Sequence, residues 1–127
     1  MTKPKWLTDL ELMLSEEKGR GYITPKGLSV YVRVTTRRIK DNDDGLVGPR
    51  VRTLEIANVN ATKIGQGCFS RWLPKFEALA DKNNRVVYVE NVQTVRFRKF
   101  FTKRGYIPCD TGQTDPIYPV SFWRKSR

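Results

Sequence analysis

The chain has 127 residues, 39% of them hydrophobic and 29% charged, which is the balance of a single soluble domain spanning residues 1–127. No apolar run approaches the ~20 residues of a membrane span, and the N-terminus lacks the apolar core of a signal peptide. The only cysteines, Cys68 and Cys109, make no disulfide framework, so we expect a cytoplasmic protein. Histidine is absent, which excludes Ser-His-Asp and Cys-His catalysis, and the cysteines alone cannot fill a zinc site, so we expect no metal.

The charge is strongly positive, with a formal net charge of +11 from 24 Lys and Arg against 13 Asp and Glu. This predicts an anionic partner: coenzyme phosphates, nucleic acid or an acidic protein surface. Arg33 and Arg37 lie at even spacing on one strand, and Arg96, Lys99 and Lys103 lie along one helix side. The alternative for each cluster is a solvated basic surface without a partner.

The first segment predicts a helix, followed by a break. The apolar residues at helical spacing are Trp6, Leu7, Leu10, Met13 and Leu14. Thr8 and Glu11 have the spacing of a capping box, so the helix begins near residue 5 or near residue 9. Gly19 and Gly21 are expected to stop it.

Two strands follow. Residues 28–38 alternate apolar valines with polar or basic residues, which predicts a half-buried strand. The turn-forming residues 41–45 make 28–38 and 50–60 an expected antiparallel pair.

The second half alternates helices and strands. A helix follows Gly67, with aromatic residues on its core side and Asn83-Asn84 at its end. Pro74 belongs in a first turn, so either this helix kinks or a short turn precedes it. Residues 85–90 predict a central strand, and 94–104 a helix with Phe97, Phe100 and Phe101 toward the core and Gly105 beyond its end. After a loop, 120–123 predict a final strand, with a hairpin as an alternative.

The most informative motif is the glycine turn Lys63-Ile64-Gly65-Gln66-Gly67, between a strand and a helix. Such a turn points backbone amides at one spot, and the helix dipole helps that spot to bind a phosphate or pyrophosphate. A tight turn without a ligand is the alternative interpretation.

Further on, Val89-Glu90-Asn91-Val92 leads to Arg96 and then to Arg104-Gly105-Tyr106. With the Gly-x-Gly turn, this segment resembles the GNAT superfamily of N-acetyltransferases, and most of all small phage-encoded members. In those, a G-x-G-x-F turn precedes a V-E-N-V-x-N-x-R segment that ends in R-G-Y. The resemblance covers about half of the chain. It implies an α/β fold with a GNAT-like mixed central sheet flanked by helices and a shortened N-terminal half.

The resemblance also implies a coenzyme site. In the family, the strand before the turn splays from the next strand, and acetyl-CoA binds in the gap. The amides of Lys63, Ile64, Gly65, Gln66, Gly67 and Cys68 would then hold the pyrophosphate. Ala57, Asn58 and Val59 would offer backbone partners to pantetheine, and Asn91 and Arg96 would line the far side.

Two departures from the family pattern matter for the chemistry. Thr62 stands where the loop has Gln or Arg, so either Lys63 compensates for that loss or the loop binds less tightly. Phe101 stands where many members have the Tyr that protonates the leaving thiolate. Glu55 is the first candidate to take the amine proton, with pairing to a nearby arginine as its alternative role. Glu90 is the second candidate, unless it caps the following helix. Cys68 is either a thiol activated at a helix start or a packing residue.

The leading functional hypothesis is a coenzyme-A-dependent N-acyltransferase with acetyl-CoA as donor and an unknown amine acceptor. The alternative is a non-catalytic GNAT-like basic protein whose surface, including Arg33, Arg37, Lys99 and Lys103, binds nucleic acid or an acidic host protein. An acetyltransferase with a nucleic-acid-bound substrate would combine the two. A phage-encoded chain would act in the host cytoplasm, and the oligomeric state stays open.

Overall fold

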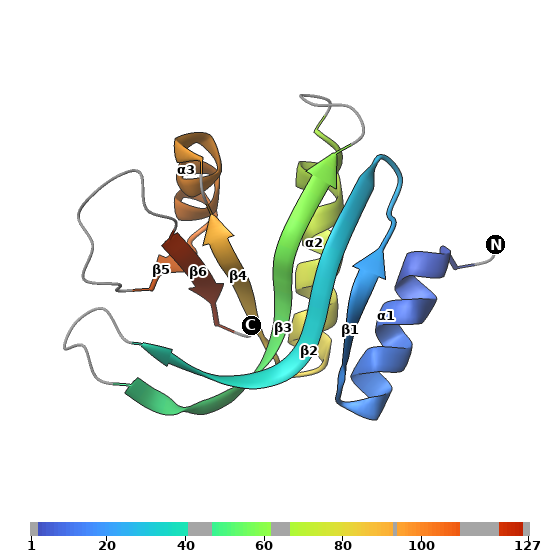
Figure 1. Cartoon of the computed structure of the whole chain (residues 1–127), viewed down its shortest axis with the longest axis horizontal. Coiled ribbons are helices and arrows are strands. Elements are labelled where there is room, and N and C mark those ends of the chain that lie inside the picture. Colours follow the sequence, from blue (N-terminus) through green and yellow to red (C-terminus); the bar gives the residue numbers. More distant parts are fainter. Residues whose placement is uncertain (1–2, 41–46, 62–66, 93, 110–119, 126–127) are drawn as a thin grey trace.

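A computed structural model describes residues 3–40, 47–61, 67–92, 94–109 and 120–125, so the predicted turn at 41–45 lies outside these ranges. The described residues form, in order, α1 (Lys5–Glu16), β1 (Gly19–Ile23), β2 (Leu28–Lys40), β3 (Val47–Ala61), α2 (Cys68–Lys82), β4 (Val86–Val92), α3 (Val95–Lys103), β5 (Ile107–Pro108) and β6 (Val120–Arg124) (Figure 1). The strands form one mixed sheet in the order β1-β2-β3-β4-β6-β5, which confirms the predicted mixed α/β fold. None of the helices in the described ranges has the length and apolar character of a membrane span.

The start of α1 is the earlier of the two predicted. The helix begins at Lys5, after Pro4, and no side chain caps it. The expected capping box is wrong, because Thr8 lies inside the helix and Glu11 pairs with Lys3 at 3.2 Å. The residues of α1 that reach the core are Trp6, Leu10 and Leu14.

Strand β1 was not predicted. The helix ends at Glu16 because Glu17 adopts a left-handed φ of 57°, so Gly19 and Gly21 do not stop it. Both glycines belong to β1, which pairs antiparallel with β2. At Gly19 φ is +133°, and an added Cβ would lie 3.0 Å from Met13 Cγ. Glycine is therefore required where β1 passes α1, and the alternation that marks a strand is lost there.

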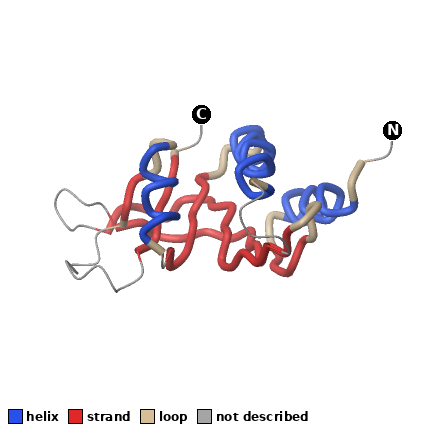
Figure 2. The backbone as a smooth tube through the Cα atoms, turned by 90° about the horizontal axis from the view of Figure 1, so that it is seen from above, coloured by secondary structure: helices blue, strands red, loops and turns tan. Residues whose placement is uncertain are grey.

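The long pair of β2 and β3 is antiparallel, as predicted. Apolar residues of one sheet face pack against the helices, and Figure 2 shows the helices on one side of the sheet. We call the other side the open face. It carries Arg20 and Tyr22 of β1, Tyr31, Arg33 and Arg37 of β2, Glu55 of β3 and Tyr88 and Glu90 of β4.

The aromatic side chains of α2 pack in the core as predicted; they are Phe69, Trp72 and Phe76. Pro74 lies inside the helix, so the short turn expected before the helix is wrong. Pro74 has no amide to donate to the carbonyl of Ser70. Both residues are exposed, so the carbonyl of Ser70 is not shut off from solvent.

The C-terminal half follows the prediction with one addition. β4 lies inside the sheet, parallel to β3 and antiparallel to β6. α3 falls within the predicted range, and Gly105 follows its end with a φ of 85°. The unpredicted β5 is only two residues long and pairs antiparallel with β6, as in the hairpin alternative.

Candidate functional site

A cleft opens where the two central parallel strands separate. β3 and β4 pair in register from Thr53 with Val86 to Ile56 with Val89, and the pairing ends there. Beyond this point, residues 57–59 of β3 and 90–92 of β4 line a cleft of about 350 Å³. The two arrows diverge toward the ends nearest α3 (Figure 1). The sequence resemblance had implied this splaying of the strands.

Both walls of the cleft carry an irregularity at the same level. On β3, Ala57 is an extra residue in the register with β2. On β4, the register with β6 shifts between Val89 and Val92, and Asn91 within this step has a φ of 51°. A bulge bends its strand and increases the local twist. Two bulges facing one another therefore explain why the strands part here.

Four predicted coenzyme-binding residues line this cleft: Ala57, Asn58, Val59 and Asn91. Past Ile56, the edge of β3 that faces β4 has no strand partner in the described part of the chain. Its amides and carbonyls therefore need another hydrogen-bond partner, which water or an extended ligand provides. The amide of Asn91 instead donates to Ser121 Oγ at 3.0 Å, which anchors the bulge of β4.

An aromatic wall closes the side of the cleft next to the helices. It consists of Phe69, Phe97 and Phe101, and the rings of Phe69 and Phe97 lie 5.8 Å apart. The prediction placed Phe97 toward the core, but its side chain is 40% exposed. The four-residue spacing of Phe97 and Phe101 was the available signal, because it puts both rings on one side of α3. Phe101, in the place of the family's Tyr, lines the cleft and has no proton to donate.

The glycine turn leads into the N-terminus of α2, and its residues 63–66 lie outside the described ranges. Gly67 precedes the helix with a φ of 70°, and Cys68 is the first helical residue. Arg71, which the sequence analysis missed, lies beside both: its Nη2 is 3.6 Å from Cys68 Sγ, and a Cβ on Gly67 would lie 3.2 Å from its Nη1. A guanidinium next to a helix N-terminus adds positive charge where an anion would bind. The signal was a basic residue one helical turn after the last glycine.

Arg96 does not reach the cleft. It is exposed in the first turn of α3 and is not among the lining residues. Thr94 lines the cleft instead and caps α3, since its Oγ1 accepts a hydrogen bond from the Phe97 amide at 3.2 Å. Thr94 stands where the family motif has Asn, and both residue types cap helices.

Glu55 is at the centre of a buried ion-pair network. Its side chain is 0% exposed, and its oxygens accept hydrogen bonds from Arg33 Nε at 3.1 Å and from Arg37 Nε at 2.8 Å. Thr53 Oγ1 donates a further bond at 2.8 Å. Glu55 does not line the cleft. Its position matches the alternative role, a partner for arginines, although it is buried and not on the surface.

Glu90 has the more open position. Glu90 is among the residues that line the cleft, and its carboxylate is 30% exposed and accepts a hydrogen bond from Arg33 Nη2 at 2.7 Å. It does not cap α3, because Thr94 does so. Arg33 thereby connects the buried Glu55 of β3 to the Glu90 carboxylate of β4.

The two arginines predicted as polyanion contacts therefore serve the fold. Arg33 and Arg37 share one face as predicted, but both neutralise Glu55. The hydrogen bond that Arg37 donates to Glu55 raises the pKa of Arg37, whose guanidinium also lies 4.2 Å above the ring of Tyr88. Reversing either charge would leave a buried carboxylate without its partner, so such variants do not isolate polyanion binding.

Comparison with known proteins concerns the fold. No protein-family model and no curated protein matches the chain. A solved structure from Corynebacterium glutamicum ATCC 13032, described as histone acetyltransferase HPA2 and related acetyltransferase, is similar with a TM-score of 0.51 and 14% sequence identity. The match covers 100% of this chain and 80% of that one. The chain therefore has a GNAT-like fold, a six-stranded mixed sheet whose central parallel strands splay at a cleft.

Proposed function

We propose that this protein is a coenzyme-A-dependent N-acyltransferase with acetyl-CoA as donor and an amine as acceptor. The observation that carries the proposal is the cleft between β3 and β4, where a strand edge without a strand partner lies opposite a bulged strand. An extended pantetheine arm presents amide groups that complete such an edge, as an added strand would. The GNAT-like fold supports this assignment.

We assign each part of the coenzyme to residues that follow one another from β3 to the start of α2. Ala57, Asn58 and Val59 take the pantetheine, with Asn91 on the opposite wall. The amides of residues 63–68 take the pyrophosphate. Thr62 stands where the family loop has Gln or Arg, and Arg71 would supply a positive charge in its place, because its guanidinium lies beside Gly67 and Cys68. Arg96, exposed on α3, is left at the outer rim, where only the nucleotide end of the coenzyme would meet it.

The proton of the attacking amine is assigned to Glu90. When bound, acetyl-CoA supplies the acyl group as a thioester. Glu90 is among the residues that line the cleft and its carboxylate is partly exposed, which makes it our candidate to accept the proton of an amine bound there. Glu55 acts through Arg33, whose guanidinium fixes the Glu90 side chain. Phe101 donates no proton, so water protonates the leaving thiolate.

Calorimetry with acetyl-CoA tests the binding step. Ala57→Leu fills the cleft, while Ala61→Leu makes the same change on the same strand at an exposed position outside the lining. We expect heat of binding with the unmodified protein and with Ala61→Leu, and at least about tenfold weaker binding with Ala57→Leu. Folded protein that gives no heat with millimolar acetyl-CoA would refute the proposal. Gly65→Glu, which brings a negative charge to the phosphates, should cost on the order of 2 kcal/mol or more.

A second candidate function is a GNAT-like binding protein without catalysis. Phe101 favours it, because this ring occupies the cleft side where the family's proton donor stands. It predicts acetyl-CoA binding without release of free coenzyme A in the presence of amine acceptors. We place either function in a cytoplasm, that of a host cell for a phage-encoded chain, where the free Cys68 and Cys109 stay reduced.

A further inference from the structure

The open face carries features that the proposed acyltransferase site does not use. Along β1 and β2 the residue pairs that face away from the helices are Tyr22 with Tyr31 and Arg20 with Arg33. In Figure 2, none of the drawn helices covers this side of the sheet. A sheet face left without a covering layer is normally polar, so exposed aromatic side chains on it need an explanation.

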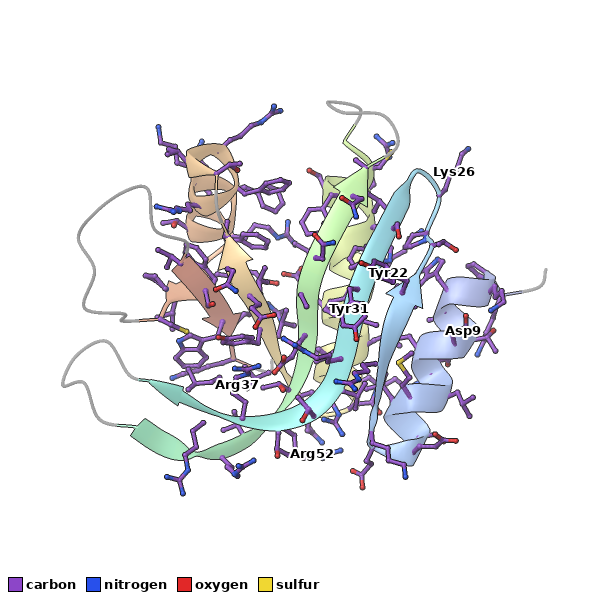
Figure 3. The ribbon with its side chains drawn as sticks, in the orientation of Figure 1. Asp9, Tyr22, Lys26, Tyr31, Arg37 and Arg52 are labelled. Atoms are coloured by element: carbon purple, nitrogen blue, oxygen red, sulfur yellow. The ribbon has the colours of Figure 1, made fainter. Side chains whose placement is uncertain are left out.

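The aromatic feature is a pair of tyrosine rings. Tyr22 is 56% exposed, and its ring meets that of Tyr31 edge to face with centroids 5.0 Å apart. Figure 3 shows the two side chains next to each other on β1 and β2. The neighbouring ring holds Tyr22 in place while much of its surface stays open to solvent. This is a fixed platform on which another flat ring can stack.

The basic feature is a groove that adjoins this platform. It has a volume of about 440 Å³, and its lining contains Lys18, Arg20, Arg33 and Arg37 but no acidic residue. Arg33 and Arg37 are paired with Glu55, whereas no carboxylate of the described residues pairs with Lys18 or Arg20. Arg20 also lies directly opposite Arg33 in the sheet, and since Glu55 and Glu90 already pair with Arg33, Arg20 is the cation of the two that has no carboxylate partner among the described residues.

From these features we infer that the open face binds a single-stranded nucleic acid. Lys18 and Arg20 contact its phosphates in the groove, and a base stacks on Tyr22. Basic grooves combined with exposed aromatic rings are how proteins bind unpaired strands. A duplex keeps its bases stacked on one another, so it would leave the tyrosines without a role. An acidic peptide would use the cations but would likewise gain nothing specific from the ring pair.

This inference goes beyond the proposed acyltransferase and does not depend on it. The platform and the groove have no lining residue in common with the cleft. Nucleic-acid binding is therefore measured without acetyl-CoA, and failure of either proposal leaves the other intact.

Fluorescence polarisation with a labelled single-stranded oligothymidylate of about 12 nucleotides tests the groove. We expect binding at about 50 mM salt that weakens steeply toward 200 mM, with a log–log slope of about −0.7 for each phosphate contact. The double variant Lys18→Ala and Arg20→Ala should reduce the slope by about 1.4. Lys75→Ala with Lys82→Ala removes the same charge from exposed positions of α2 and should leave the slope unchanged.

Substitutions of Tyr22 test the stacking platform. Tyr22→Ala should weaken binding by about fivefold or more, and Tyr22→Phe, which keeps the ring, should bind like the unmodified protein. Absence of binding at the lower salt would overturn the inference. It would also be overturned if Tyr22→Ala bound normally, or if a duplex or polyglutamate displaced the labelled strand as well as an unlabelled single strand does. The last two results would indicate a general polyanion surface.

Discussion

Arg33 joins two carboxylates that lie on different strands: its Nη2 is 2.7 Å from Glu90 Oε2, and its Nε is 3.1 Å from Glu55 Oε1. Glu90 lines the cleft, and Glu55 is fully buried. One guanidinium thus spans β3 and β4 near the point where their pairing ends. The buried carboxylate of Glu55 holds the arginine in place, and the arginine in turn holds the side chain of Glu90.

The first prediction separates the roles of these carboxylates. Glu90→Gln should lower turnover with an amine acceptor by ~10²–10⁴-fold while acetyl-CoA still binds, because a general base is lost but the cleft is not. Glu55→Gln should mainly lower the free energy of unfolding, since it removes the charge that Arg33 and Arg37 neutralise. Steady-state kinetics and urea unfolding measure the two effects. Normal turnover by Glu90→Gln would exclude Glu90 as the base.

The second prediction concerns the stability of the network. Arg37→Ala should lower the free energy of unfolding by about 2–3 kcal/mol, because the buried Glu55 loses two hydrogen bonds from that guanidinium. Arg38→Ala removes the same charge from the next, exposed residue and should change stability by no more than about 0.5 kcal/mol. Equal effects of the two variants in urea unfolding would mean that net charge, and not the pairing, is responsible.

The third prediction concerns the proline inside α2. Pro74→Ala should raise the free energy of unfolding by about 1 kcal/mol, since the new amide donates to the carbonyl of Ser70 and part of this gain is offset by a freer unfolded chain. Ala78→Pro, at another exposed position of the same helix, should lower it by about 3 kcal/mol. Thermal unfolding measures both. A loss of stability in Pro74→Ala would show that the proline is favourable where it is.

The fourth prediction concerns pH. Burial raises the pKa of Cys109 from its ordinary 9.0 to about 11. The folded state then holds the thiol proton more tightly than the unfolded state, so this contribution to stability is present below pH 9 and is lost as the pH rises through 11. In a Cys68→Ser background, alkylation of Cys109 should be half-maximal in rate near pH 11 when folded and near pH 9 in urea. The same midpoint in both states would contradict the raised pKa of this half-buried thiol.

Most of the secondary structure could be predicted from the sequence. The alternation of Val30, Val32 and Val34 and the helical spacing of Trp6, Leu10 and Leu14 are local patterns, and burial confirms both. Such patterns predict secondary structure because side chains return to the same face every two residues in a strand and every three to four in a helix. The spacing of apolar residues over a short segment therefore indicates which face is buried. β1 could not be predicted because its glycines, Gly19 and Gly21, are placed where the strand passes close to α1. That contact is tertiary, so the local sequence pattern does not show it.

The site was determined in part by sequence and in part by tertiary structure. By itself, the sequence determined the strand on either side of the gap, and its resemblance to a known family pointed to Ala57, Asn58, Val59 and Asn91, which line the cleft. The predicted Gly-x-Gly turn lies mostly outside the described residues and stays a prediction. Only the tertiary structure decided that Glu55 is buried under two arginines, that Phe97 lines the cleft, and that Arg71 lies beside Gly67. Arg33 and Glu90 are 57 residues apart in the chain, and their contact exists because β2, β3 and β4 lie side by side in one sheet. Pairing of this kind depends on strand order and register, which residue spacing along one segment does not contain.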